Sequence, residues 1–147
     1  LTEAGREFTS NVLLVASGME RRKLKIKGEK ELSGKGVAYC ATCDGMFFKD
    51  KITAVIGGGN SAAVSALYLA DIAKKVYLIH RRSNLRAEET WQKKIADNPK
   101  IETVFDNSVE EFLGNEKLEK VVLKNEYNGS KELYIDGIFI EIGYVPA

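Results

Sequence analysis

Cysteine and histidine are scarce in this sequence of 147 residues, which contains two cysteines and one histidine. The cysteines, Cys40 and Cys43, are too close together to cross-link distant parts of a fold, so a structural disulfide scaffold is disfavoured. With the single histidine, His80, they cannot supply the four ligands of a closed tetrahedral zinc site. We therefore predict no metal site.

Long apolar runs and an excess of one charge are also lacking. No apolar stretch approaches the length that spans a bilayer, no signal peptide opens the chain, and the formal net charge is +1. We therefore expect no membrane and no nucleic-acid partner. The close cysteine pair fits a redox role in the cytoplasm better than a structural disulfide. The basic run at residues 21–27 is expected to be a solvated connecting segment. The chain starts at Leu1, as a fragment or a processed product would.

Hydrophobic patterning predicts alternating strands and helices. Buried strands are expected at 11–18, 51–56 and 76–79, further strands at 101–105 and 138–143, and helices at 61–73 and 87–96. Asn128-Gly129, between apolar segments, predicts a hairpin because type I′ turns need positive φ. The fold class is therefore α/β: a Rossmann-like three-layer domain with a parallel sheet and an antiparallel β-meander.

A glycine-rich turn lies between a predicted strand and a predicted helix. Its sequence, Gly57-Gly58-Gly59-Asn60-Ser61-Ala62, fits the dinucleotide fingerprint G-x-G-x-x-A. Gly57 permits the tight turn, Gly59 lets a pyrophosphate approach the backbone, and Ala62 lets helix and strand pack closely. The helix start favours the anion. The alternative is a glycine turn that binds nothing.

The end of the next strand selects the nucleotide. NAD and FAD sites usually carry an acid there, about twenty residues beyond the turn, to hold the ribose hydroxyls. This sequence has His80-Arg81-Arg82, followed by Arg86, and no carboxylate. Guanidinium groups hold a 2′-phosphate, which an acid would repel. The sequence therefore predicts NADP(H), with His80 as a phosphate-binding residue rather than a catalytic base.

The cysteine pair precedes this unit, in Cys40-Ala41-Thr42-Cys43-Asp44. Two cysteines at this spacing can close a small disulfide ring, and a helix start stabilises a thiolate. Asp44 is close enough in sequence to act as an acid or a base for a leaving thiolate. We interpret the pair as redox-active, and two inert cysteines are the alternative.

These three blocks, in this order and spacing, resemble the central NADPH-binding domain of low-molecular-weight thioredoxin reductases of bacteria and archaea. The most specific part is Cys-Ala-Thr-Cys-Asp-Gly, residues 40–45. The resemblance implies residues 1–18 as a residual connecting strand from a flavin domain and residues 19–147 as the NADPH-binding domain carrying the redox cysteines. It also implies that Ile142 and Gly143, at a crossing between the domains, contact the cofactor.

The function that the resemblance implies is a relay from NADPH to FAD, then to the Cys40–Cys43 disulfide and then to thioredoxin or a related small disulfide protein. Cys43 would face the flavin, Cys40 would attack the partner disulfide, and Asp44 would donate a proton. The complete enzyme would be a homodimer whose two domain orientations alternate, because the cysteines and the nicotinamide cannot both contact the flavin.

Two departures from the family pattern qualify this prediction. The flavin-binding glycine fingerprint is absent, so the isolated chain is expected to hold little FAD and not to turn over. Val64 and Ser65 replace acids that are common after the glycine turn. The apolar run at 12–16 is expected to pack back on the domain or to pair with another copy. The alternatives are a nucleotide-sensing module without reductase activity and a ferredoxin-linked thioredoxin reductase.

Overall fold

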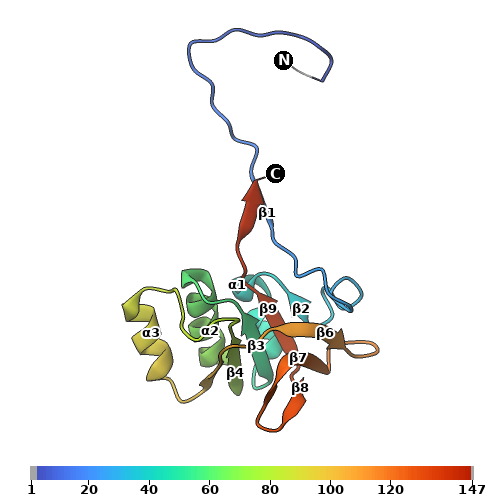
Figure 1. Ribbon diagram of the computed structural model, residues 1–147, viewed down its shortest axis with the longest axis vertical. Coiled ribbons are helices and arrows are strands. Elements are labelled where there is room, and N and C mark those ends of the chain that lie inside the picture. The colour runs from blue at the N-terminus through green and yellow to red at the C-terminus, as the bar shows by residue number, and fades with distance from the viewer. Residues whose placement is uncertain (1–2, 147) are drawn as a thin grey trace.

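A five-stranded parallel sheet is the middle layer of the structure, a computed structural model that describes residues 3–146 (Figure 1). Residues 1 and 2 of the connecting strand expected at 1–18, and residue 147 of the domain expected at 19–147, lie outside the described residues. The strand order is β2-β9-β3-β4-β5. The bounds are β2 Val37–Ala38, β3 Ile52–Ile56, β4 Lys75–Ile79, β5 Ile101–Val104 and β9 Gly137–Ile140.

The helices cover one face of this sheet (Figure 1). They are α1 (Ala41–Asp44), the 3-10 helix η1 (Gly45–Phe48), α2 (Asn60–Ile72) and α3 (Glu89–Ala96). The face of α2 toward the sheet is built of small residues, and Ala62, Ala66 and Leu69 have no exposed surface. Alanine brings the helix axis close to the strands, so the start of α2 lies directly beside the end of β3.

An antiparallel three-stranded sheet covers the other face, formed by β6 (Val109–Leu113), β7 (Lys120–Tyr127) and β8 (Ser130–Tyr134). Its hairpin turns at Asn128 and Gly129, with φ of 52° and 80°. Both values are positive, as a type I′ turn requires. The predicted fold class, a three-layer α/β domain with a parallel sheet and an antiparallel meander, is therefore confirmed.

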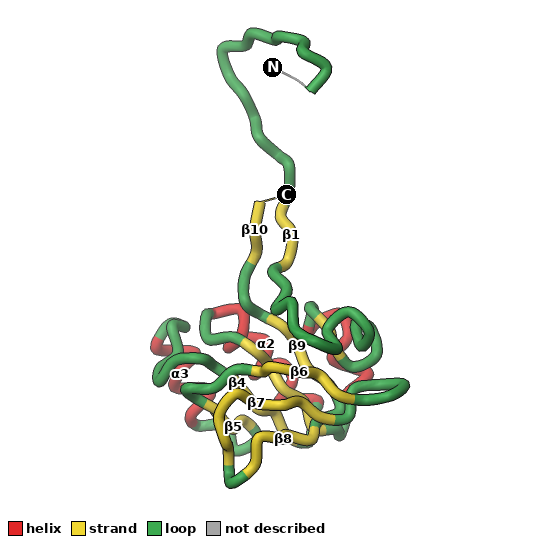
Figure 2. Tube along the Cα trace, turned by 45° about the vertical axis from the view of Figure 1, so that its right-hand side comes forward, coloured by secondary structure: helices red, strands yellow, loops and turns green. Residues whose placement is uncertain are grey.

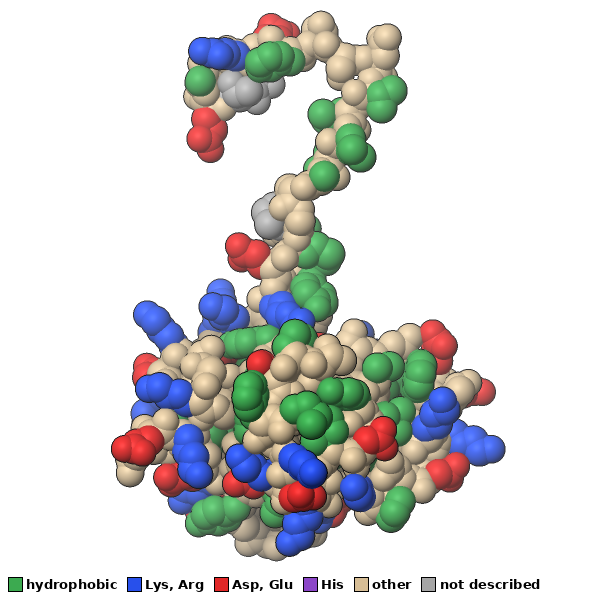
Figure 3. Space-filling view, turned by 180° about the vertical axis from the view of Figure 1, so that it is seen from behind, with side chains coloured by type: hydrophobic (Ala, Val, Ile, Leu, Met, Phe, Trp, Pro, Cys, Tyr) green, Lys and Arg blue, Asp and Glu red, His purple; other side chains and the backbone are tan. Residues whose placement is uncertain are grey.

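Strands β1 (Met19–Arg21) and β10 (Tyr144–Pro146) pair to form a two-stranded ribbon that projects from the domain (Figure 2). The segment before β1 runs away from the domain and carries apolar side chains (Figure 3). The buried strand predicted at 11–18 is wrong for this chain, because Val12, Leu13 and Leu14 are 84%, 81% and 86% exposed. No described strand pairs with this segment, so its apolar residues have no surface to cover. The prediction that it packs back on the domain is wrong as well.

The longest described helix, α2, has 13 residues, and none of the described helices is long and apolar enough to cross a membrane.

A buried carboxylate ties the segment after β1 to the strand that precedes the cysteines. Glu29 is 5% exposed and accepts hydrogen bonds from the backbone N–H groups of Leu24 and Lys25, at 3.0 and 2.5 Å. It also accepts one from the Tyr39 hydroxyl, at 2.8 Å. Three donors on one carboxylate offset the cost of burying its charge. The Glu29 contact therefore holds this segment to the residue next to Cys40.

The Tyr39–Glu29 bond should be detectable by its dependence on pH. Burial, with the hydrogen bond and negative charge of Glu29, raises the pKa of Tyr39 from 10.0 to about 12. Since the folded pKa lies above the unfolded one, the bond stabilises the fold fully below pH 10, and this stabilisation is lost as the pH rises toward 12. Tyr39→Phe should lower the free energy of unfolding by about 1–2 kcal/mol at pH 7, measured by urea unfolding.

The deficit of Tyr39→Phe relative to wild type should shrink between pH 10 and 11.5. Tyr134→Phe, at a hydroxyl whose side chain is 64% exposed, serves as the control and should change the free energy of unfolding far less. A deficit that stays constant over this pH range would contradict the assignment of the high pKa to Tyr39.

Candidate functional site

The glycine turn lies where three elements converge. Gly57 follows β3, has φ of 155°, and donates its N–H to Ile79 O at 3.1 Å. A Cβ at this position would overlap the backbone oxygen of Glu141 after β9 and lie 2.7 Å from the Cβ of Ala62 in α2. Only glycine fits between the two strand ends and the helix, which is the close packing that the fingerprint predicts.

The middle glycine is in contact with the single histidine. His80 is 5% exposed, and a Cβ on Gly58 would overlap its imidazole ring. Burial lowers the pKa of His80, and the neighbouring Arg86, Arg82 and Arg81 lower it further, against an opposing hydrogen bond with the backbone of Asn84. The ring is therefore neutral at pH 7. Its Nε2 is buried and has no hydrogen-bond partner among the described residues.

A backbone hydrogen bond brings one of the predicted arginines to the turn. The N–H of Arg86 donates to Gly58 O at 2.6 Å. Asn60 and Glu88 fasten the same loop to the start of α2 by a reciprocal pair: Asn60 Nδ2 donates to Glu88 Oε1 at 2.8 Å, and the Glu88 N–H donates to Asn60 Oδ1 at 2.9 Å. Asn60 thus positions the loop, a role that the sequence pattern did not predict.

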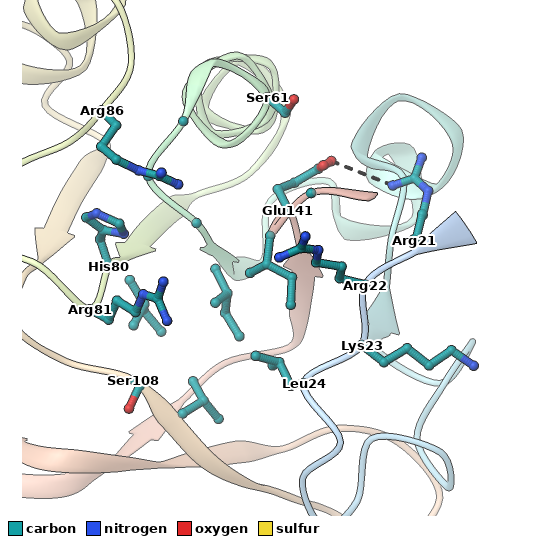
Figure 4. Close-up of a pocket in the computed structure, with 18 of the residues that line it drawn as sticks. Arg21, Arg22, Lys23, Leu24, Ser61, His80, Arg81, Arg86, Ser108 and Glu141 are labelled. Atoms are coloured by element: carbon teal, nitrogen blue, oxygen red, sulfur yellow. Dashed lines mark ion pairs between the residues drawn. The ribbon is translucent and has the colours of Figure 1, made fainter. Parts of the chain in front are cut away.

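These residues line a cavity of about 1110 Å³ at the carboxyl ends of the central strands (Figure 4). Of the predicted cofactor-binding residues, the lining includes Gly57, Gly58, Gly59, Asn60, Ser61, His80, Arg81, Arg86, Ile142 and Gly143. Ala62 is buried behind the turn, and Arg82 is exposed and does not belong to the lining. The structure thus brings most of the predicted residues together around one space.

The cavity has features that fit a nucleotide phosphate. A Cβ on Gly59 would meet no atom within 4 Å, so the space before the start of α2 is open to a ligand. The guanidinium groups of Arg81 and Arg86 line the cavity and are available donors. Helix start, open backbone and cationic side chains together form a binding site for an anion.

Several lining residues were not predicted. The basic run, expected to be merely solvated, reaches the cavity through Arg21, Arg22 and Lys23. Glu141 also lines it, and burial raises the pKa of this carboxyl, while the hydrogen bond from Ser65 and the charge of Arg21 lower it. No local pattern signals these residues, because the contact depends on pairing between β1 and β10, which are distant in the chain.

The cysteines form a second centre outside this cavity. Cys40 and Cys43 are joined in a disulfide with a Cα–Cα distance of 5.3 Å, at the start of α1. Cys43 is exposed and Cys40 is half-buried. The N–H of Asp44 donates to Cys40 O at 3.1 Å, which places Asp44 one helical turn from Cys40. Beyond them, Met46 and Phe47 are 62% and 73% exposed.

The domain thus combines a cavity at a dinucleotide-type glycine turn with a separate, accessible disulfide. The family model described as pyridine nucleotide-disulphide oxidoreductase matches residues 1–147. The chain therefore belongs to this family, and the resemblance predicted from its motifs is confirmed.

Individual relatives give the same result. A thioredoxin reductase of Listeria innocua is 40% identical over 99% of this chain and 46% of its own length. The solved thioredoxin reductase of Lactococcus lactis has a TM-score of 0.84 and 42% identity, over 88% of this chain and 44% of that one. A ferredoxin-flavin thioredoxin reductase of Clostridium acetobutylicum has a TM-score of 0.63 and 35% identity, over 84% and 38%. The chain thus spans less than half the length of these relatives.

The first and third glycines of the turn should respond differently to the same substitution. Gly57→Ala forces a Cβ into backbone and should lower the free energy of unfolding by about 2–4 kcal/mol. Gly59→Ala meets no atom and should cost less than about 1 kcal/mol of stability, yet weaken nucleotide binding, because its methyl group occupies the open space.

Urea unfolding and nucleotide titration of both variants measure the two effects. Gly129→Ala, in the remote hairpin, is the control for nucleotide binding because it lies outside the cavity lining. If Gly59→Ala bound nucleotide as wild type does, Gly59 would not lie beside the bound phosphates.

Proposed function

We propose that this chain is the NADPH-binding and redox-dithiol domain of a flavin-dependent thioredoxin-disulfide reductase. The observation that carries the proposal is the coexistence of two centres on one domain: a cavity where the glycine turn meets Arg81 and Arg86, and the Cys40–Cys43 disulfide outside it. Either centre alone is common to several classes of protein. Together they match a family whose members pass electrons from a pyridine nucleotide to a disulfide.

The cationic end of the cavity supports NADPH over NADH. Arg81 and Arg86 supply planar groups that bind a 2′-phosphate bidentately, and the neutral ring of His80 packs against Gly58. When bound, NADPH would supply a hydride to FAD, and the two electrons would pass from there to the disulfide. The chain's own part is to hold the phosphates at the glycine turn and to direct the nicotinamide end toward Ile142 and Gly143.

The chemistry at the cysteines is a thiol–disulfide exchange. In the reduced chain, the Cys40 thiolate attacks one sulfur of the partner disulfide and displaces the other as a thiolate, to which Asp44 would give a proton. Cys43 then attacks the Cys40 sulfur, which re-forms the Cys40–Cys43 disulfide and releases the partner as a dithiol. Two electrons pass from the domain to the partner.

An apolar surface beside the disulfide supports a protein partner. Met46 and Phe47 lie three and four residues after Cys43 and are among the exposed large apolar residues of the described domain. Exposed apolar side chains next to a reactive disulfide favour docking of another protein over exchange with small thiols. We propose thioredoxin, or a related small disulfide protein, as this partner.

The remaining parts of the proposal concern the complete enzyme. Residues 1–18 belong to a connecting strand from an FAD-binding domain, and residues 19–147 to the NADPH-binding domain. The complete protein is a homodimer in the cytoplasm. In this compartment, glutathione and thioredoxin systems keep a catalytic dithiol reduced. A ferredoxin-linked reductase needs no nucleotide, and a nucleotide sensor needs no disulfide, so each alternative leaves one of the two centres without a use.

Nucleotide preference tests the first half of the proposal. Wild type should bind NADPH about 100-fold or more tightly than NADH, because the 2′-phosphate forms charge-assisted hydrogen bonds. Arg81→Ala should reduce this preference by about tenfold or more, measured by isothermal titration calorimetry with both nucleotides. Lys74→Ala removes the same charge at the opposite end of β4 and should leave the preference unchanged.

Equal binding of NADH and NADPH by wild type would exclude the NADP(H) assignment. An unchanged preference in Arg81→Ala would show that other groups hold the phosphate.

Trapping of the partner protein as a mixed disulfide tests the second half of the proposal, the disulfide exchange. Thioredoxin whose attacking cysteine carries a thionitrobenzoate group should form a mixed disulfide with the chain and release the coloured thiolate. Cys43→Ser, which keeps Cys40, should react at least about tenfold faster than Cys40→Ser, because Cys40 is the proposed attacking thiol at the start of α1. Absorbance and intact-mass measurements follow the reaction. Faster trapping by Cys40→Ser would reverse the assignment of the two cysteines.

A further inference from the structure

Glu141 is one of three acids, with Glu20 and Glu88, in a cavity whose other charged lining side chains are basic. Glu141 follows β9, and its N–H donates to Ile56 O at 2.8 Å, so its backbone is fixed at the end of the central strands. The side chain is only 10% exposed. Ser65 Oγ donates to Glu141 Oε1 at 3.0 Å, and Arg21 Nη1 lies 4.0 Å from the same oxygen.

Ser65 and Arg21 contact only one of the two oxygen atoms of the Glu141 carboxyl. Both contacts involve Oε1, and Oε2 has no hydrogen-bond partner among the described residues. Oε2 is not one of the buried side-chain atoms without a partner, so it keeps surface that is open to the cavity. Burial raises the pKa of Glu141, consistent with a group that lacks a full set of partners. The free oxygen is therefore available to a ligand donor.

The position of Glu141 indicates which part of a ligand it faces. In Figure 4, His80, Arg81 and Arg86 lie on one side of the cavity, and Glu141 and Arg21 lie on the other. With the adenosine phosphate at the arginines and the pyrophosphate at the glycine turn, the far half of a dinucleotide extends toward Glu141. An anionic phosphate beside Glu141 would be repelled, whereas a neutral group with N–H donors would be bound.

On the basis of the proposed function, we propose that Glu141 is the residue that recognises the carboxamide of the nicotinamide, by accepting a hydrogen bond from its amide nitrogen. Ser65 and Arg21 are positioning residues, because they hold Oε1 and thereby orient the carboxyl. Glu141 thus recognises the nicotinamide end of the ligand, while the arginines recognise the phosphate end. The ligand class is a nicotinamide dinucleotide rather than any 2′-phosphorylated adenosine compound.

Three ligands separate this role from a structural one. NADPH has the carboxamide, its 3-acetylpyridine analogue has a methyl ketone in its place, and 2′,5′-ADP lacks the nicotinamide half. At pH 8, wild type should bind NADPH about tenfold more tightly than the acetylpyridine analogue. In Glu141→Ala this preference should fall to about twofold or less, and 2′,5′-ADP should bind within about twofold of wild type.

Two further variants serve as controls for these titrations. Glu126→Ala makes the same charge change at an exposed position of β7 and should retain the full preference. Glu141→Gln keeps the size of the side chain and its contact with Ser65, and should lower the preference about threefold if Glu141→Ala does not fold. Circular dichroism and thermal unfolding establish whether each variant is folded.

The outcomes distinguish this proposal from the function on which it rests. If wild type does not bind 2′,5′-ADP, the NADPH-binding function itself is wrong. If 2′,5′-ADP binds but Glu141→Ala leaves the preference for NADPH over the analogue unchanged, or weakens all three ligands equally, Glu141 serves only to hold Arg21 and Ser65, and the recognition of the carboxamide is overturned.

Discussion

The site depends on one steric constraint: β3, β9 and α2 converge on Gly57, where no side chain fits. This convergence fixes the course of the glycine turn, and the turn in turn positions its neighbours. The carbonyl of Gly58 accepts the N–H of Arg86, and the ring of His80 packs on Gly58. The cationic end of the cavity is thus built on the backbone of the turn, so the residues proposed to bind phosphate are attached to a fixed backbone before any ligand arrives.

The second consequence of the fold is that the two centres are separate. Neither Cys40 nor Cys43 belongs to the lining of the cavity. Electrons that pass from a nucleotide to the disulfide therefore need a carrier that reaches both, and this is the place that the proposal gives to a flavin. Under the proposed function, a flavin domain would be joined through the β1–β10 ribbon. Arg21 of β1 pairs with Glu141 in the cavity. The cavity and the ribbon thus share the contact between Glu141 and Arg21.

Short sequence patterns predicted the elements whose structure depends mainly on residues that are neighbours in the chain. The helix at α2, the strands β3 and β4, and the hairpin at Asn128-Gly129 follow from periodicity and from turn residues with positive φ. The short strands β2, β6 and β10 were not predicted, because pairing partners rather than their own residues define them. The apolar run at 12–16 was wrongly assigned as a buried strand, since an apolar sequence forms a strand only where a neighbour is available. The same limit explains why Glu141 and Arg21 were missed: their proximity arises from long-range pairing.

The most direct test of the account is a crystal structure of this chain with bound NADP⁺. The account predicts the 2′-phosphate within hydrogen-bonding distance of Arg81 and Arg86, and the pyrophosphate over Gly58 and Gly59 at the start of α2. A nucleotide whose adenosine end lay away from these arginines, or outside the cavity altogether, would contradict it.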